Sequence, residues 1–375
     1  MKLLYIVSHP IQYQAPLLRQ ISAETDIDLK VIFEDDFSES RYFDPGFGVD
    51  VEWDVALLDG YESVLLREIN SAEYLREADV IWFHGWQSRQ FRKLLKLAKS
   101  IGTPVLMRGE NWSVAMPDGK FLKGWLKRFY LNQIFSKCDA YLAIGSANHT
   151  YYLEHGIAED KIFNVPYAVD NVFFEAPSTK ETAEKFRQEL GITANQKMVL
   201  FAGKFTPRKK PDLLLKAWAE VDWNPSDRPA LVFVGDGDLK TSLMADAERT
   251  EFKDNIHFTG FRNQTELPGI YRAADVFVLA SEKEPWGLGI NEAMASGTAV
   301  IASDQCGASF DLLSNETGAV VEAGSVMDLA SALLNVVGHS EKCGRAAKKR
   351  IANWDFAADI AGLKSALEYI KEAAK

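Results

Sequence analysis

Two glutamates, Glu284 and Glu292, lie eight residues apart on either side of a glycine-containing turn. The apolar run 276–280 before them predicts a short buried strand, and residues 290–296 predict a helix that Gly297 can end. The turn therefore joins a strand to a helix start, whose backbone N–H groups and positive dipole end suit a diphosphate. Carboxylates beside such an anion site can accept hydrogen bonds from sugar hydroxyl groups.

The segment resembles the E-x7-E signature of retaining glycosyltransferases, in particular glycosyltransferase family 4. Spacing, glycines, second glutamate and the following Ala-Met-Ala agree together, whereas two glutamates eight residues apart would be weak evidence alone. The alternative is an ordinary turn with two solvated carboxylates. The resemblance implies that Glu284 grips the transferred sugar and Glu292 holds the ribose. It also implies that the turn between them holds the diphosphate of the sugar donor, through Pro285, Trp286, Gly287, Leu288 and Gly289.

A strongly basic loop follows another predicted strand and contains Lys204, Arg208, Lys209 and Lys210. A diphosphate leaving group gains negative charge as its glycosidic bond breaks, so cations fixed there stabilise the transition state more than the ground state. The loop is similar to the family's G-R-L-x-P-x-K-G, with Lys204 in place of the arginine and Lys209 matching the lysine. Lysine lacks the bidentate fork of arginine, and Arg208 or Lys210 are candidates to replace it. The alternative is a solvated basic turn.

Three more sites in this half of the chain are expected to contact the nucleotide. The resemblance places Gly203 and Gly235 in loops near the diphosphate, and it places Phe261 and Arg262 at the turn that meets the base. Core packing is the alternative for Phe261. A D-x-D sequence, Asp236 to Asp238, fits a tight turn rather than a metal site. We therefore expect no metal and no cofactor, with the nucleoside diphosphate sugar as co-substrate.

In the N-terminal half, His84 ends the strand of an A-D-V-I-W-F-H sequence. This is similar to the family's A-D-V-x-H-x-H, which implies that His84 contacts the transferred sugar; a structural histidine is the alternative. His9 and Gln14, in the first loop, and Arg108 and Glu110, after a later strand, are the acceptor-side candidates. The alternatives are packing of His9 on the neighbouring proline and a structural ion pair between Arg108 and Glu110.

Strands alternate with helices in two series separated by a break near 167–195, which predicts two parallel α/β sheets. The resemblance implies the GT-B fold, in which two Rossmann-like domains face each other across a cleft and the C-terminal helix returns to the N-terminal domain. The expected acceptor-side domain is 1–168 with the helix 355–375, and the nucleotide-sugar domain is 169–354. We predict no regular element for 34–62, an extended segment with aromatic and acidic residues.

Composition narrows the class of protein. The net charge of −11 over 375 residues argues against a general nucleic-acid binder. The three cysteines have neither metal nor disulfide spacing, which favours a reducing compartment. Because the chain has no run of about 18 apolar residues and no signal-peptide pattern, we expect a cytoplasmic protein with at most peripheral contact at the inner face of the membrane.

Residues 120–129 predict an amphipathic helix with aromatic and leucine side chains on one face and lysine and arginine on the other. We favour packing of the apolar face against the sheet. The alternative is contact with an anionic membrane, close to a lipid-linked acceptor.

Together these features predict a retaining hexosyltransferase. It would move a hexose from a nucleoside diphosphate sugar, by default a UDP-sugar, to a hydroxyl of a glycan, lipid-linked or small-molecule acceptor, in bacterial surface polysaccharide or glycoconjugate synthesis. The alternatives are a catalytically silent partner in a polysaccharide-synthesis complex and a nucleotide-sugar epimerase on the same fold. A nicotinamide dehydrogenase is set aside, because no G-x-G-x-x-G follows the first predicted strand.

Overall fold

The computed structural model describes residues 1–115, 121–225, 227–373 and 375. The chain forms two compact units, each built on its own parallel sheet. Unit 1 comprises Met1–Arg41, Val55–Ala168 and Trp354–Lys375, and unit 2 comprises Tyr42–Asp54 and Val169–Asn353. The polypeptide therefore passes from one unit to the other four times.

The sheet of unit 1 has seven parallel strands in the order β5-β2-β1-β6-β7-β8-β9. Apolar residues fill the strands because helices cover both faces, as expected of a parallel sheet. The strand order reverses between β1 and β6. From β1 the chain adds strands toward one edge of the sheet (β2, β5), and from β6 it adds them toward the other edge (β7, β8, β9). The strands are β1 (Lys2–Val7), β2 (Asp28–Phe33), β5 (Glu62–Leu65), β6 (Val80–His84), β7 (Val105–Arg108), β8 (Ala140–Ala143) and β9 (Ile162–Asn164).

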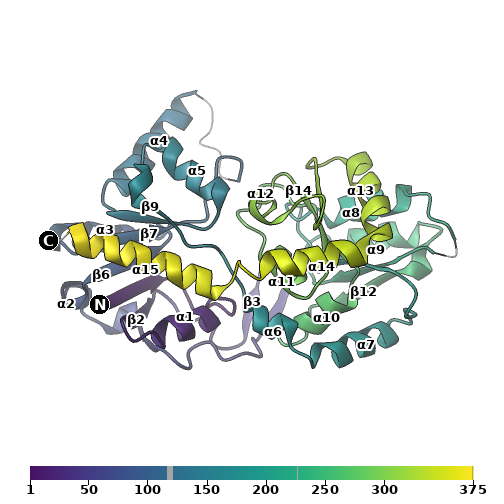
Figure 1. Ribbon diagram of the computed structural model, residues 1–375, viewed down its shortest axis with the longest axis horizontal. Helices are drawn as coiled ribbons and strands as arrows, with labels where there is room; N and C mark the ends of the chain where they lie inside the picture. The colour runs from purple at the N-terminus through teal and green to yellow at the C-terminus, as the bar shows by residue number, and fades with distance from the viewer. Residues whose placement is uncertain (116–120, 226, 374) are drawn as a thin grey trace. The chain divides into compact units, whose positions relative to one another are not determined.

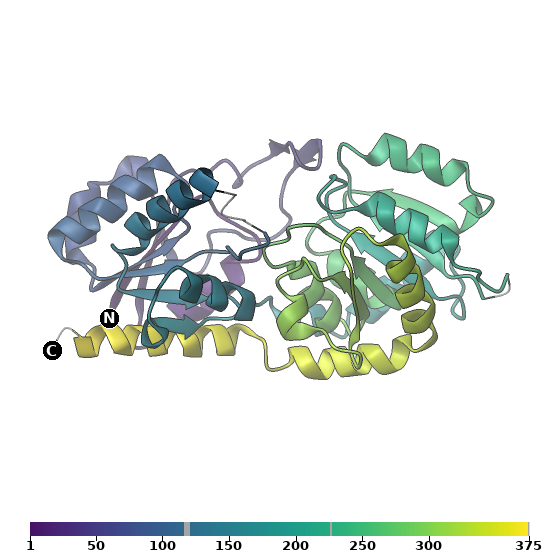
Figure 2. The ribbon, with the colours of Figure 1, turned by 90° about the horizontal axis from the view of Figure 1, so that it is seen from above.

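Helices form a layer on each face of this sheet (Figure 2). One layer contains α2 (Ser71–Glu77), α3 (Arg89–Ile101), α4 (Phe121–Phe135) and α5 (Ser146–Glu154), and the other contains α1 (Ala15–Ser22) and α15 (Phe356–Ala373). The C-terminal helix α15 runs along β8 and β9 (Figure 1). The Asp355 side chain accepts a hydrogen bond from the Ala358 N–H, and this cap fixes the start of α15. The predicted return of the C-terminal helix to the N-terminal half is therefore confirmed.

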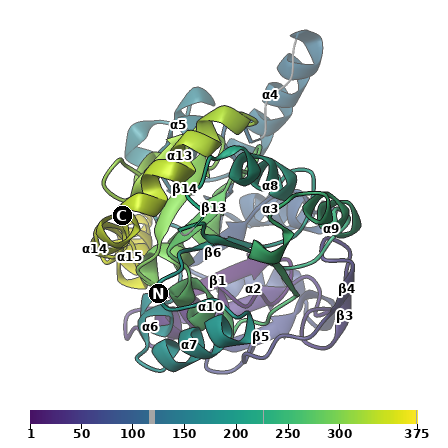
Figure 3. The same ribbon diagram turned by 90° about the vertical axis from the view of Figure 1, so that its right-hand side faces the viewer.

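The sheet of unit 2 has six parallel strands in the order β12-β11-β10-β13-β14-β15, and its order reverses between β10 and β13. Helices α8, α9 and α13 lie on one face, with α10, α11 and α14 on the other (Figure 3). The strands are β10 (Met198–Ala202), β11 (Ala230–Val234), β12 (Ile256–Gly260), β13 (Val276–Leu279), β14 (Ala299–Ser303) and β15 (Gly318–Val321). The helices are α6 (Asn171–Glu175), α7 (Thr179–Glu189), α8 (Pro211–Glu220), α9 (Lys240–Glu248), α10 (Leu267–Ala273), α11 (Leu288–Ala295), α12 (Ser309–Leu312), α13 (Val326–Gly338) and α14 (Ser340–Ile351).

The segment without a predicted element contains a small antiparallel hairpin, β3 (Tyr42–Asp44) and β4 (Val49–Val51). Their position in the sequence predicts that these residues belong to the N-terminal domain. The structure places 42–54 in unit 2 instead, because their contacts are made with unit 2. Strands of three residues carry too little periodicity to be recognised in advance.

Helix α4 also differs from the prediction. The favoured packing of its apolar face against the sheet is wrong for Leu122, Trp125, Leu126 and Phe129, which are 50–68% exposed. The Trp125 and Phe129 rings stack on each other with centroids 5.9 Å apart, and the helix is anchored by buried side chains nearer its end, such as Ile134 and Phe135. Lys120 lies outside the described residues, and within those residues no helix is long and apolar enough to cross a membrane.

Candidate functional site

The two predicted loops of the sugar-donor site leave neighbouring strands of unit 2. The basic loop follows β10 and the loop with Glu284 follows β13, and β10 and β13 are the pair between which strand order reverses. In an open parallel sheet, ligands bind outside the carboxyl ends of the strands at such a switch point. Topology therefore brings the cations and the first glutamate of the sequence motif to one place.

Direct ion pairs join these two loops. The Glu284 Oε2 atom lies 2.7 Å from the Lys209 Nζ atom and 3.0 Å from an Arg208 guanidinium nitrogen. A second pair, Lys210 to Glu282 at 2.9 Å, lies beside them, and the Glu282 N–H donates to the Arg208 carbonyl. Glu284 is only 6% exposed. The predicted partnership of the basic loop with the glutamate motif is thus a buried contact in which Glu284 holds cations in place.

The two glutamates have opposite electrostatic environments. Burial would raise the pKa of the Glu284 carboxyl, but Lys209 and Arg208 outweigh it and hold the pKa below its ordinary value. Burial raises the pKa of Glu292, against a hydrogen bond from the Tyr271 hydroxyl at 2.7 Å and the charge of Lys209. The Lys209 ammonium therefore acts on both carboxyl groups of the motif.

The turn between the glutamates leads directly into the start of α11. Gly287 adopts a φ of 99°, a conformation that residues with a Cβ rarely adopt, directly before α11. The buried Trp286 donates its indole N–H to Asn291 Oδ1 at 2.8 Å. Pro285 follows Glu284 at the beginning of this turn, and Leu288 and Gly289 are the first residues of α11. Their position gives the site an N-terminal helix end of the kind that binds phosphate groups.

Lys204, the lysine in place of the family's arginine, has a different partner. Its Nζ atom lies 2.8 and 2.9 Å from the two carboxylate oxygens of Asp44, in the β3–β4 hairpin. Arg208 and Lys210, the candidates to replace the arginine, are paired with Glu284 and Glu282. The sequence had no signal for Asp44, because it lies 160 residues away in a segment without a predicted element.

The other predicted nucleotide contacts lie along the same edge of the sheet. The Gly203 N–H donates to the Val234 carbonyl, and the Gly235 N–H donates to the Gly260 carbonyl. These two hydrogen bonds connect the ends of β10, β11 and β12. Phe261 is not a core residue; it is partly exposed, and its ring lies 5.0 Å from the Phe47 ring of the hairpin. The Arg262 guanidinium pairs with Glu266 at 2.9 Å. Among the described residues, no group of three His, Cys, Asp or Glu side chains could hold a metal ion.

A second polar cluster surrounds His84 at the carboxyl ends of β1, β6 and β7 in unit 1. The His84 Nδ1 atom lies 2.7 Å from the Tyr5 hydroxyl and 3.4 Å from the Gln14 amide nitrogen, and Nε2 lies 3.5 Å from Glu110 Oε1. The Tyr167 hydroxyl donates to the same Glu110 oxygen at 2.6 Å. Three of the predicted residues of unit 1 therefore lie together: His84, Gln14 and Glu110.

The charge of Glu110 fixes one proton in this cluster. Burial would raise the pKa of Glu110, but hydrogen bonds and charge from His84, then Tyr167 and Arg108, hold it below its ordinary value. An ionised carboxylate only accepts hydrogen bonds, so the His84 Nε2 atom carries the proton on the side that faces Glu110. The His84 Nδ1 atom, on the other side of the ring, faces the Tyr5 hydroxyl at 2.7 Å.

Arg108 does not belong to an acceptor-binding surface. It is 2% exposed, and it pairs with the fully buried Asp359 of α15 at 2.9 Å rather than with Glu110. Its guanidinium also donates to the Val165 carbonyl and lies 4.9 Å from the centre of the Tyr167 ring. The prediction that Arg108 contacts the acceptor is therefore wrong, because the side chain is enclosed and fastens the returning helix to the sheet.

His9, the remaining acceptor-side candidate, lies apart from these contacts. Its ring packs against Phe37 with centroids 4.5 Å apart, and its Nδ1 atom lies 2.9 Å from the Ser8 hydroxyl. Burial lowers the pKa of His9. The alternative of ring packing named the neighbouring proline, whereas the structure gives Phe37 as the ring partner of His9.

Sequence reasoning missed the tyrosines of both clusters: Tyr5, Tyr13, Tyr167 and Tyr271. Tyr5 and Tyr271 lie within a strand and a helix, where an aromatic residue predicts core packing. Tyr13 and Tyr167 lie in loops next to strand or helix ends. That position is the one sequence feature that could have marked them as site residues.

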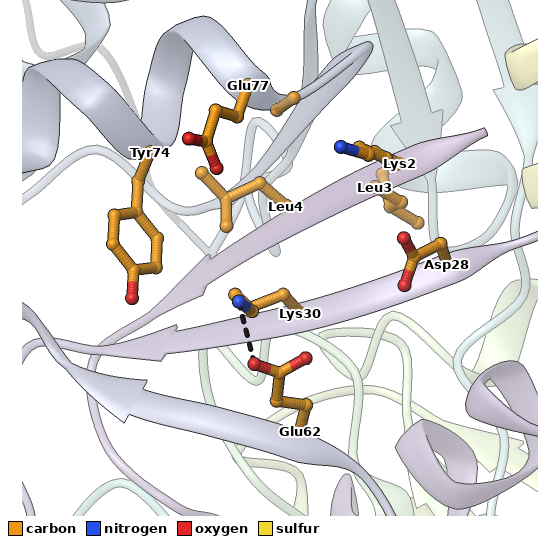
Figure 4. A pocket seen from close by; sticks show the side chains of 9 residues that line it. Lys2, Leu3, Leu4, Asp28, Lys30, Glu62, Tyr74 and Glu77 are labelled. Atoms are coloured by element: carbon orange, nitrogen blue, oxygen red, sulfur yellow. Dashed lines mark ion pairs between the residues drawn. The ribbon is translucent and has the colours of Figure 1, made fainter.

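A small cavity of about 110 Å³ opens at the opposite edge of the unit 1 sheet (Figure 4). It is lined at the amino ends of β1 and β2 by charged side chains, of which Lys30 and Glu62 pair at 2.7 Å. The cavity lies away from the strand ends that bear His84.

Comparisons with known proteins relate the chain to glycosyltransferases. A family model described as glycosyl transferases group 1 matches residues 182–351. D-inositol 3-phosphate glycosyltransferase of Corynebacterium glutamicum is 33% identical over 301 residues, which span 76% of this chain and 71% of that protein. Alpha-monoglucosyldiacylglycerol synthase of Streptococcus pneumoniae is 35% identical over 139 residues, 37% of this chain and 31% of that protein.

Two solved structures extend the likeness to the whole chain. HepE of Anabaena, in complex with UDP and glucose, matches with a TM-score of 0.73 at 18% identity, over 98% of this chain and 100% of that one. Sucrose-phosphate synthase from Thermosynechococcus elongatus matches with a TM-score of 0.69 at 19% identity, over 100% of both chains. The predicted GT-B fold is confirmed.

Proposed function

Because the chain belongs to the group 1 glycosyltransferases, we propose that it is a retaining, family 4-like hexosyltransferase that uses a nucleoside diphosphate sugar. A UDP-sugar is the default donor, and HepE, a protein of the same fold, was solved with UDP and glucose. The acceptor is a hydroxyl of a glycan, lipid-linked or small molecule in bacterial surface polysaccharide or glycoconjugate synthesis. No metal takes part in this proposal.

The observation that carries the proposal is the cation pair held by Glu284 at the switch point of unit 2. Lys209 and the start of α11 would bind the diphosphate, while Glu292 would accept hydrogen bonds from the ribose. Glu284 would act mainly by orienting Lys209, whose charge is otherwise free to move on a flexible side chain. A lysine already fixed at the leaving group needs no reorganisation when the negative charge develops.

The reaction breaks the bond between the sugar C1 atom and the phosphate oxygen and forms a bond between C1 and the acceptor oxygen. Retention would follow if the acceptor attacks from the face that the phosphate leaves. The acceptor proton then passes to the departing phosphate oxygen, so the balance requires no separate base. His84 and its hydrogen-bonded partners would orient hydroxyl groups of the sugar and acceptor.

A binding and turnover panel tests this proposal. Thermal unfolding is measured with UDP, GDP, ADP and dTDP and their glucose conjugates, since ligand binding stabilises the folded state by RT ln(1 + [L]/Kd). One base should raise Tm, and its sugar conjugate should release nucleoside diphosphate with a supplied acceptor. Lys209→Ala should lose both effects, while Lys216→Ala on the exposed side of α8 should keep them. A panel without any Tm shift would support the silent-partner alternative.

Exposure of the apolar residues of α4 favours an additional role for this helix. We propose that it contacts an anionic membrane surface, since Lys123 and Arg128 are exposed beside Trp125 and Phe129. Vesicles with phosphatidylglycerol should co-sediment the protein, vesicles of phosphatidylcholine alone should not, and the double variant Trp125→Ala/Phe129→Ala should lose binding. Met327→Ala, at an exposed apolar position of unit 2, serves as the control. Equal binding by both variants would exclude the helix as the contact.

A further inference from the structure

The β3–β4 hairpin is part of the same unit as the sugar-donor site, although unit 1 precedes and follows it in sequence. Its last residues are fastened to the loop after β12: the Thr265 N–H donates to the Asp54 carboxylate at 3.2 Å, and Asn263 donates to the Glu52 carbonyl at 2.6 Å. These bonds hold the hairpin over strand ends where we expect the nucleotide.

Asp44 is the last residue of β3, pairs with Val49 of β4 and leads directly into the hairpin turn. Its Oδ1 atom accepts hydrogen bonds from the Gly46 and Phe47 N–H groups at 2.8 and 3.1 Å, and its carbonyl accepts from Gly48 at 2.8 Å. Burial would raise the pKa of Asp44, but Lys204 and these backbone groups hold it below its ordinary value. The turn thus presents a buried, charged carboxylate, 7% exposed as a residue, to Lys204.

Lys204 is confined on three sides by this turn. Its Nζ atom contacts both Asp44 oxygens and lies 4.9 Å from the centre of the Phe47 ring. At Gly46 a Cβ atom would lie 2.6 Å from the lysine Cδ atom, so the backbone itself approaches the side chain. An ammonium group has three N–H bonds, and the Lys204 side chain is still 38% exposed. Two N–H bonds suffice for the two Asp44 oxygens, which leaves one for a ligand.

We propose that Asp44 is a positioning residue of the sugar-donor site, which holds Lys204 so that its remaining N–H binds the diphosphate. The inference rests on the proposed function and deepens it. Lysine has no planar fork to fix its orientation, and a buried carboxylate in a tight turn supplies that constraint from outside. Arg208 and Lys210 pair with Glu284 and Glu282, so among these cations Lys204 is the one that Asp44 holds.

The test separates binding of the diphosphate from binding of the nucleoside. Affinities for UDP and uridine, or for the diphosphate and nucleoside of whichever base the wild type prefers, are measured for Asp44→Asn, Lys204→Ala and the double variant. Asp44→Asn should weaken UDP binding about tenfold and uridine binding less than twofold, because a charged hydrogen-bond network is lost at the phosphates alone. Asp44→Asn should add no further loss in the Lys204→Ala background.

Two further variants distinguish positioning of Lys204 by Asp44 from a purely structural role of Asp44 in the hairpin. Asp54→Asn loosens the other end of the hairpin and should leave the ratio of UDP to uridine affinity unchanged within about twofold. Asp44→Glu keeps the charge and should lose less UDP affinity than Asp44→Asn; thermal unfolding verifies that each variant is folded. Unchanged or tighter UDP binding by folded Asp44→Asn, or an equal effect of Asp54→Asn, overturns the inference. If the wild type binds none of the four nucleoside diphosphates, the proposed function fails first and the inference fails with it.

Discussion

The two units bear polar clusters at the same topological position but with different chemistry. In unit 2 the loops after the two central strands, β10 and β13, meet through ion pairs of Glu284 with Lys209 and Arg208. In unit 1 the corresponding strands are β1 and β6, and the side chains there meet through phenol, imidazole and amide groups around His84. The strand orders of the two sheets are equivalent around the reversal.

This difference shows that the fold alone does not decide which ligand each unit suits. A parallel sheet provides converging loops at its switch point, and the side chains on those loops decide the chemistry. Fixed cations and a helix start favour a polyanion such as a diphosphate. Hydroxyl, imidazole and carboxylate groups that exchange hydrogen bonds favour neutral sugar or acceptor hydroxyls. Arg108, whose charge helps to lower the pKa of Glu110, is itself enclosed with Asp359 and fastens the returning helix.

The largest effect on activity is expected from a substitution that breaks the charged cluster of unit 2. Lys209→Ala should lower kcat about 10²–10³-fold, because one preorganised donor at the developing charge is lost. Lys209→Arg should recover part of the loss by keeping the charge. Turnover of the favoured UDP-sugar with a fixed acceptor measures both, and Lys216→Ala is the control for a lysine removed nearby on α8. Activity within threefold of wild type would show that the cations of unit 2 are structural.

The next effect tests the neutral cluster of unit 1. Glu110→Gln should lower kcat/KM for the acceptor about 10–100-fold, since the carboxylate that fixes the His84 proton is replaced by an amide. Kd for the nucleoside diphosphate should change less than about twofold. Tyr167→Phe, which removes one hydrogen bond to Glu110, should give the same pattern with a smaller loss. Equal losses in nucleotide binding would remove the distinction between the two clusters.

The sequence predicted most strands of both sheets, because they are short apolar runs with flanking glycine or polar residues, but it did not predict β5 or helices such as α2, α9 and α13. It also predicted that the basic loop and the glutamate motif belong together, since both lie at strand ends. It could not predict which cation meets which anion: Asp44 with Lys204, and Asp359 with Arg108, are separated by 160 and 251 residues. Such pairs depend on packing between distant elements, and short strands such as β3 and β4 carry no periodic signal of their own.

A smaller effect concerns stability at Glu284. Its pKa is lowered in the folded state, so its ionised form stabilises the protein above the ordinary glutamate pKa, and this contribution is lost as pH falls through the folded value. Glu284→Gln should destabilise the protein by about 1–3 kcal/mol at pH 7, because two cations lose a buried partner. Denaturant unfolding without ligand at pH 7 and pH 4 measures the difference, which should shrink at the lower pH. A constant difference would mean that packing, not charge, is lost.

The smallest effect is of opposite sign and concerns Glu292. Its pKa is raised by burial, so the folded state holds its proton more tightly than the unfolded chain, and wild-type stability is lost as pH rises through the folded value. Glu292→Gln should therefore raise Tm by about 1–3 °C at pH 8, with the gain disappearing at pH values below the ordinary glutamate pKa. The amide keeps an oxygen that can accept from the Tyr271 hydroxyl, which makes the substitution a test of charge rather than of shape. A lower Tm at pH 8 would mean that Lys209 pairs with Glu292 strongly enough to offset its burial, and the two glutamates would then form one charged cluster.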